Sequence, residues 1–110
     1  MANKEEVKAV LRQHGGKHSL LFAAAQGMVE DVAELIKGGA DVNQTDSGKH
    51  TALHHAAANG HTATVDALIQ GRADVNAVNE DGKTPLDWAK LHGRTEVARL
   101  LEAAGGRVKR

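Results

Sequence analysis

The sequence predicts an all-α solenoid, in which short helix-turn-helix units are stacked side by side. Three glycines, Gly27, Gly60 and Gly93, stand 33 residues apart, and leucines and alanines around them keep the same spacing. Each glycine separates two short apolar stripes with the i, i+3, i+4 spacing of one helical face. Helices of about ten residues are unstable alone in water, so each unit must share a core with its neighbours.

The chain is expected to begin with a lone helix. Asn3 and Glu6 are placed as an N-cap pair, and an apolar stripe runs from Val7 to Leu11. The stripe has the spacing of the second helix in each later unit. We therefore interpret residues 1–16 as an N-terminal capping helix, and a frayed solvent helix is the alternative.

Three repeats follow, at about residues 17–49, 50–82 and 83–106. The second begins at Thr51, whose hydroxyl is a good N-cap acceptor, and the third begins at Thr84, with proline at the first helical position.

The third repeat is predicted to close the array. Asp87, Lys90 and Glu102 place polar groups where earlier repeats have histidine, alanine and isoleucine, and a terminal repeat needs a polar outer face. Residues 107–110 carry three positive charges and are expected to be a disordered basic tail.

The period and several short motifs together resemble the ankyrin repeat family. The resemblance covers about residues 16–106, and it departs from the family pattern at the start of the first repeat. It implies a non-catalytic module that binds another protein through its loop tips and first helices, which in this family form a concave surface. The motifs that carry it are Thr51-Ala52-Leu53-His54, Ala56-Ala57, Gly60-His61, Thr84-Pro85-Leu86 and the Ala-Asp-Val-Asn runs ending at Asn43 and Asn76.

The resemblance also implies that residues 44–50 and 77–83 form hairpin-like fingers. The glycine of the first loop, Gly48, comes one place earlier than Gly82 does in the second, which predicts a different turn geometry. The asparagines before the loops, Asn43 and Asn76, are interpreted as loop-stabilising. Their surroundings resemble a target of asparaginyl hydroxylation, and whether they are modified is left open.

Composition gives no support to several classes of function. The formal net charge is zero and the chain has no cysteine, so nothing indicates broad attraction to nucleic acid, a disulfide scaffold or thiolate chemistry. No apolar run approaches the roughly 18 residues of a membrane span, and no signal peptide is evident. We expect a cytoplasmic monomer that binds neither nucleic acid nor membrane.

Catalytic and metal sites are not expected. The chain has seven histidines, but His50 and His54 do not share a helix face, and no acidic residue or cysteine completes a short-range ligand set. Gly82-Lys83-Thr84 lacks the glycine and the strand of a phosphate-binding loop. No cofactor is predicted, and a metal- or nucleotide-dependent enzyme is only a distant alternative.

The expected binding surface lies on the fingers and first helices. Phe22, His55 and Trp88 occupy the same register in three successive repeats, and large rings are frequent anchors of protein interfaces. Alternatively, Phe22 and Trp88 pack between helices and serve only the fold. A further alternative is a scaffold whose sequence was engineered for stability and which has no natural partner. The candidate binding residues are Phe22, Gln26, Thr45, Ser47, Lys49, His50, His55, Asn59, Val78, Glu80, Asp81, Lys83, Trp88 and His92.

Overall fold

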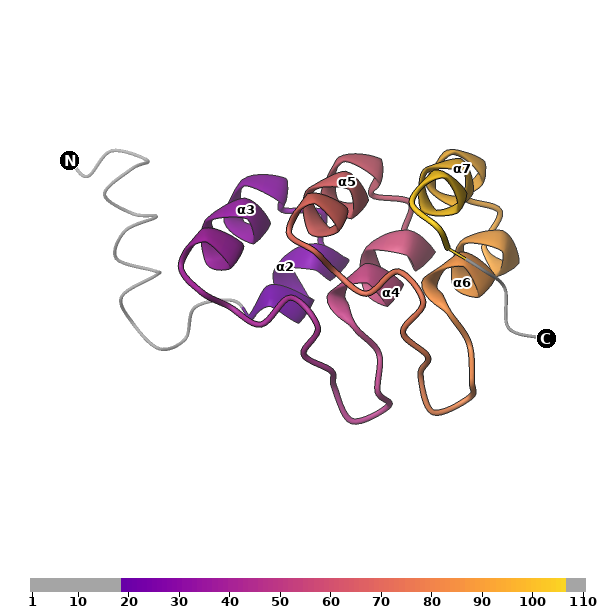
Figure 1. Ribbon diagram of the computed structural model, residues 1–110, viewed down its shortest axis with the longest axis horizontal. Helices are drawn as coiled ribbons and strands as arrows, with labels where there is room; N and C mark the ends of the chain where they lie inside the picture. Colours follow the sequence, from indigo (N-terminus) through magenta and orange to yellow (C-terminus); the bar gives the residue numbers. More distant parts are fainter. Residues whose placement is uncertain (1–18, 107–110) are drawn as a thin grey trace.

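A computed structural model describes residues 19–106, which form two parallel rows of helices (Figure 1). Helices pack against their neighbours within each row, and the two helices of one repeat pack against each other. The prediction of three helical repeats stacked as a solenoid is confirmed; the predicted N-terminal capping helix and basic tail lie outside the described residues. The first row contains α2 (Leu20–Ala25), α4 (Ala52–Ala58) and α6 (Pro85–Leu91), and the second contains α3 (Val29–Lys37), α5 (Thr62–Gln70) and α7 (Thr95–Ala103).

Side-chain caps start the first-row helices. Thr51 and Thr84 accept from the backbone N–H three residues on, and the side chains of His54 and Asp87 accept in return from the cap N–H, which makes two capping boxes. In the first repeat Ser19 caps α2 by accepting from the backbone N–H of Phe22 at 3.1 Å. This helix therefore begins one register position later than α4 and α6.

The turn between the two helices of a repeat passes through left-handed backbone at Gly27, Gly60 and Gly93, with φ of 72°, 73° and 69°. At Gly27 a side chain is also excluded by lack of space. A Cβ built on Gly27 would lie 2.6 Å from Nδ1 of His61 in the next repeat.

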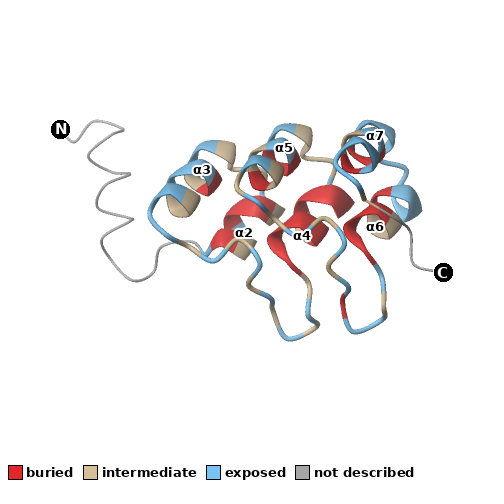
Figure 2. Ribbon diagram, in the orientation of Figure 1, coloured by how far each residue is buried: buried red, intermediate tan, exposed pale blue. Residues whose placement is uncertain are grey.

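The core lies between the two rows and between successive repeats (Figure 2). It is formed by the positions that repeat in the sequence: a leucine and an alanine near the start of each first-row helix, and aliphatic residues on the inner faces of α3, α5 and α7. Most alanines of the first row are fully buried, which lets α2, α4 and α6 approach closely. The residues with less than 2% exposure include Leu20, Ala23, Leu53, Ala56, Ala89, Val32, Val65, Leu68 and Leu101.

Polar side chains link each repeat to the next. Nε2 of His61 donates to the Ala25 carbonyl at the end of α2 (3.0 Å), and Nε of Arg94, at the same register position, donates to the Ala58 carbonyl at the end of α4 (3.0 Å). On the loop side, Oδ1 of Asn43 accepts from the backbone N–H of Asp74 at 2.7 Å. The bond from Asn43 agrees with its interpretation as a loop-stabilising residue, and the bond from His61 gives that side chain a structural role.

Two loops project from the first row on one edge, and we call them finger 1 (residues 44–50) and finger 2 (residues 77–83) (Figure 1). They touch through a hydrogen bond from the Glu80 N–H to the Gly48 carbonyl, at 3.0 Å. The predicted difference in turn geometry is wrong. Lys49 takes the left-handed conformation (φ 63°) that Gly82 takes in finger 2 (φ 73°), and the same backbone bonds close both loops. The repeat register fixes the turn, and the displaced glycine does not move it.

The position that follows the second helix is left-handed in all three repeats. Gly39 and Gly105 have φ of 98° and 95°, and Arg72 stands between them in register with φ of 71°. Gly71, at −79°, does not take over this role. Arg72 is therefore a residue with a Cβ in a conformation that favours glycine.

Candidate functional site

A cluster of aromatic and imidazole rings fills the space between finger 1, α4 and α6. Trp88 of α6 lies 4.6 Å from the ring of His50, 5.6 Å from that of His54 and 6.3 Å from that of His55, measured between ring centroids. The ring of His92, the C-cap residue of α6, lies 6.2 Å from that of Trp88. The residues come from two repeats, so the stacking of the repeats assembles the cluster.

His54 has a defined structural role in this cluster. Its Nδ1 accepts from the Thr51 backbone N–H (3.1 Å), and its Nε2 lies 2.8 Å from the Lys83 carbonyl. A backbone N–H can only donate and a carbonyl can only accept, so the ring is neutral with its proton on Nε2. Burial lowers the pKa of His54 and outweighs the opposing hydrogen bond to Lys83. His54 thus ties the start of α4 to finger 2.

Asp46 is the centre of finger 1. One carboxylate oxygen, Oδ1, accepts from the backbone N–H groups of Gly48 and His50, both at 3.0 Å. Nδ1 of His50 lies 3.1 Å from the same oxygen, and Nε2 of His55 lies 2.9 Å from Oδ2. Both rings can donate to the carboxylate.

These contacts act on the acidity of Asp46. Partial burial favours the neutral acid, but the hydrogen bonds from His55, His50 and Gly48 outweigh it and hold the pKa of this carboxyl well below its usual range. Asp46 is therefore ionised at neutral pH and accepts hydrogen bonds with both oxygens.

The expected absence of a metal-ligand set needs correction. Asp46, His50 and His55 each offer one ligand atom, and these atoms all lie within 4.8 Å of one another. The sequence argument considered His50 with His54 and overlooked both His55 as the second ring and Asp46 as the acidic residue. Asp46 stands four residues before His50, across a tight turn whose ends meet, and that spacing was the available signal.

The structure separates the predicted binding residues into three groups. His50, His55 and Trp88 are half-buried and meet in the ring cluster, so Trp88 packs against the preceding repeat and is not free-standing. Asn59, although exposed, donates from Nδ2 to the Ala25 carbonyl at 2.9 Å and so also links two repeats. The exposed remainder is Phe22 and Gln26 on α2, Thr45, Ser47 and Lys49 in finger 1, Val78, Glu80, Asp81 and Lys83 in finger 2, and His92 at the end of α6.

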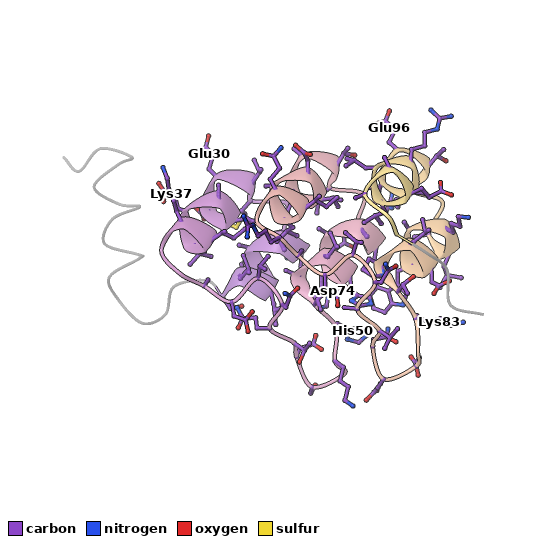
Figure 3. The ribbon with its side chains drawn as sticks, viewed as in Figure 1. Glu30, Lys37, His50, Asp74, Lys83 and Glu96 are labelled. Carbon is purple, nitrogen blue, oxygen red and sulfur yellow. The ribbon has the colours of Figure 1, made fainter. Side chains whose placement is uncertain are left out.

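Figure 3 shows how polar side chains divide between the two sides of the array. His50 and Lys83 lie on the side of the fingers, whereas Glu30, Lys37 and Glu96 project from the second row on the opposite side. Sequence reasoning missed Leu91, the last residue of α6, whose side chain is 77% exposed.

A comparison with known families decides what the repeats are. A family profile described as "Ankyrin repeats (3 copies)" matches residues 20–109. The chain belongs to the ankyrin repeat family. Ankyrin repeats are generally protein–protein interaction modules, and the family is typically non-catalytic. No curated protein matches the chain. No helix within residues 19–106 is long and apolar enough to cross a membrane.

Proposed function

We propose that this ankyrin repeat chain binds another protein through its finger side, without catalysis. The finger side comprises fingers 1 and 2 and the exposed side chains of α2, α4 and α6. Support comes from the general role of the family and from the distribution of side chains over the two rows.

The observation that carries the proposal is the placement of exposed apolar side chains. Among the described residues, the large hydrophobic side chains that remain exposed are Phe22 (45%), Val78 (44%) and Leu91 (77%). They belong to α2, finger 2 and α6. None belongs to the second row, whose outward positions include the charged Glu30, Lys37 and Glu96. Partly exposed apolar side chains gathered on the first row and its fingers are what a binding surface would provide.

Support for a non-catalytic role comes from the hydroxyl groups. Ser19 uses its hydroxyl to cap α2, and the other serine, Ser47, lies exposed in finger 1. Within residues 19–106, neither serine hydroxyl forms a hydrogen bond with a histidine or a carboxylate that could activate it as a nucleophile. A serine nucleophile therefore finds no support within residues 19–106.

The proposal is tested by capture from lysate of the source cells with the immobilised wild type and three variants. Trp88→Ala removes the central ring, Val78→Asp puts a charge on an exposed finger position, and Glu96→Ala is the matched control on α7. A specific partner should be retained by the wild type and by Glu96→Ala. Each finger-side change should weaken its binding by more than about 1 kcal/mol.

Circular dichroism melts of the three variants identify any that fail to fold. Because Val78 is largely exposed, its variant keeps the test valid if Trp88→Ala unfolds. Greater loss of binding with Glu96→Ala than with Val78→Asp would overturn the assigned side. If the wild type and the variants all capture the same proteins in the same amounts, a scaffold without a natural partner becomes the better interpretation.

A further inference from the structure

Two imidazoles and a carboxylate converge where finger 1 meets α4. The distances are 3.1 Å from Asp46 Oδ1 to His50 Nδ1 and 2.9 Å from Asp46 Oδ2 to His55 Nε2. The three side chains are 33%, 21% and 26% exposed, so they are shielded but open to a small ion.

The histidines are not needed to shape finger 1, and a comparison with finger 2 shows this. Asn79 occupies the register position of Asp46, and its Oδ1 accepts the same two backbone bonds, from Asp81 at 2.9 Å and Lys83 at 3.0 Å. Lys83 and Trp88 stand in register with His50 and His55. Finger 2 thus closes in the same way with no imidazole at either position.

The same comparison shows what the second carboxylate oxygen adds. In finger 2 the other amide atom, Nδ2 of Asn79, is buried without a hydrogen-bond partner among the described residues. In finger 1 the equivalent atom, Oδ2 of Asp46, points at the ring nitrogen of His55. Loop folding accounts for Oδ1, whereas Oδ2 and the two rings are additional to it.

We propose that Asp46, His50 and His55 form a binding site for a divalent transition metal ion of the Zn²⁺ class. The ligand atoms would be a carboxylate oxygen of Asp46, Nδ1 of His50 and Nε2 of His55. Zinc bonds of about 2.0–2.2 Å at a tetrahedral angle place ligand atoms about 3.3–3.5 Å apart. The separations of 3.1 and 2.9 Å end on different oxygens of Asp46, and the two ring nitrogens lie within 4.8 Å of each other. Rotations of the three side chains must therefore bring one carboxylate oxygen and both rings to the ion.

Binding replaces two hydrogen bonds with two coordinate bonds. Nδ1 of His50 and Nε2 of His55 must lose the hydrogens that they donate to Asp46. Each neutral ring keeps one hydrogen by carrying it on its other nitrogen, and a ring that is protonated releases a proton to solvent on binding. The carboxylate is already ionised.

The donor set indicates the class of ion. Imidazole nitrogens favour Zn²⁺, Cu²⁺, Ni²⁺ and Co²⁺, whereas Ca²⁺ and Mg²⁺ prefer sites built from oxygen alone. Three protein ligands leave a coordination position for water. Trp88, the one tryptophan of the chain, lies 4.6 Å from the His50 ring and so provides an optical reporter.

The proposal goes beyond partner binding and does not depend on it, so it is tested on the free, full-length protein with metal salts alone. Zn²⁺ is titrated by isothermal calorimetry, with Mg²⁺ as the negative ion, and Cu²⁺ quenching of Trp88 fluorescence gives an independent readout. We expect saturable binding of one Zn²⁺ per chain, no Mg²⁺ binding, and quenching that saturates at one Cu²⁺.

Asp46→Asn is the main variant, because Asn79 shows that asparagine holds this turn. It should lower the Zn²⁺ affinity about tenfold or more. The triple variant Asp46→Asn, His50→Lys, His55→Trp, which copies finger 2 and α6, should abolish specific binding. His92→Ala is the matched control, since His92 also lies beside Trp88 but away from Asp46, and it should bind as the wild type does.

Thermal melts in EDTA verify that each variant folds, and His50→Lys alone is the replacement if the triple variant does not. Undiminished one-to-one binding by the folded triple variant would place the metal elsewhere. So would loss of binding in His92→Ala. Absence of saturable Zn²⁺ binding by the wild type would refute the site outright.

Discussion

Arg72 offers the most direct test of how the repeat register constrains the backbone. It is held at φ 71° between α5 and the following loop, where Gly39 and Gly105 stand in the other repeats. The side chain is exposed, and its guanidinium forms no hydrogen bond or ion pair within residues 19–106. Arg72→Gly therefore removes a strained Cβ without breaking a side-chain hydrogen bond or ion pair within residues 19–106.

The magnitude follows from two opposing effects. Left-handed backbone costs a residue with a Cβ about 1–2 kcal/mol. Glycine in turn loses more backbone freedom on folding, about 0.5–1 kcal/mol relative to alanine. We expect strain relief to win and to raise the free energy of unfolding by a few tenths to about 1 kcal/mol. With a urea m-value of about 2 kcal/mol/M, the midpoint should rise by about 0.2–0.5 M.

Two glycine variants measure separately the left-handed strain and the effect of glycine on the unfolded chain. Gly38→Ala is at φ −79° with only ordinary contacts for a new Cβ, so it should stabilise by about 0.4–1 kcal/mol through the unfolded chain. Gly39→Ala is at φ 98° with open space around it, so it should destabilise by strain alone. A lower urea midpoint for Arg72→Gly, with both glycine variants behaving as expected, would refute the claim that Arg72 is strained.

Two further predictions concern the links between repeats. The folded-state pKa of His54 is lowered from 6.5, so as the pH falls this side chain is protonated in the unfolded chain before it is protonated in the folded protein. Its contribution to stability is therefore present above about pH 6.5 and is lost below it. Urea melts between pH 5.5 and 7.5 should show a shallower loss toward low pH in His54→Asn than in the wild type, and an unchanged slope would contradict this. Gly27→Ala and Gly93→Ala share the same left-handed strain, but a Cβ at Gly27 also meets His61 at 2.6 Å whereas one at Gly93 meets nothing within 4 Å. Thermal melts should therefore show a loss of about 1 kcal/mol for Gly93→Ala and clearly more for Gly27→Ala, and equal losses would mean that the ring of His61 moves aside freely.

The repeats could be predicted from the sequence because the residues of their core recur at a fixed spacing. Leu20, Leu53 and the alanines three residues on recur at a fixed period, and burial at those positions follows once the repeats stack. The helix starts at Thr51 and Thr84 were equally readable, since an N-cap acts within four residues. Positions one period apart also carry the signal for Arg72, which aligns with Gly39 and Gly105, both left-handed.

The site was harder to predict because it depends on contacts that no period encodes. Asp46 meets His55 only after finger 1 folds back against α4, and His50 meets Trp88 only after two repeats stack. At Lys49 the local sequence was misleading. The position of Gly48 predicted a different turn, but the backbone hydrogen bonds that close finger 1 are those of finger 2, and they place Lys49 in the left-handed conformation. Here tertiary register decides the backbone, and residue propensity is secondary.

The bond from His54 to the Lys83 carbonyl points forward along the chain, from one repeat to the loop before the next. The links from His61 and Arg94 point backward, to the end of the preceding first-row helix. A duplicated copy of residues 51–83 placed directly after the original would carry both kinds of link, and Asn76 would supply the acceptor that Asn43 supplies now. An array joined in this way can lengthen from its middle, one period at a time, while its terminal repeats stay as they are.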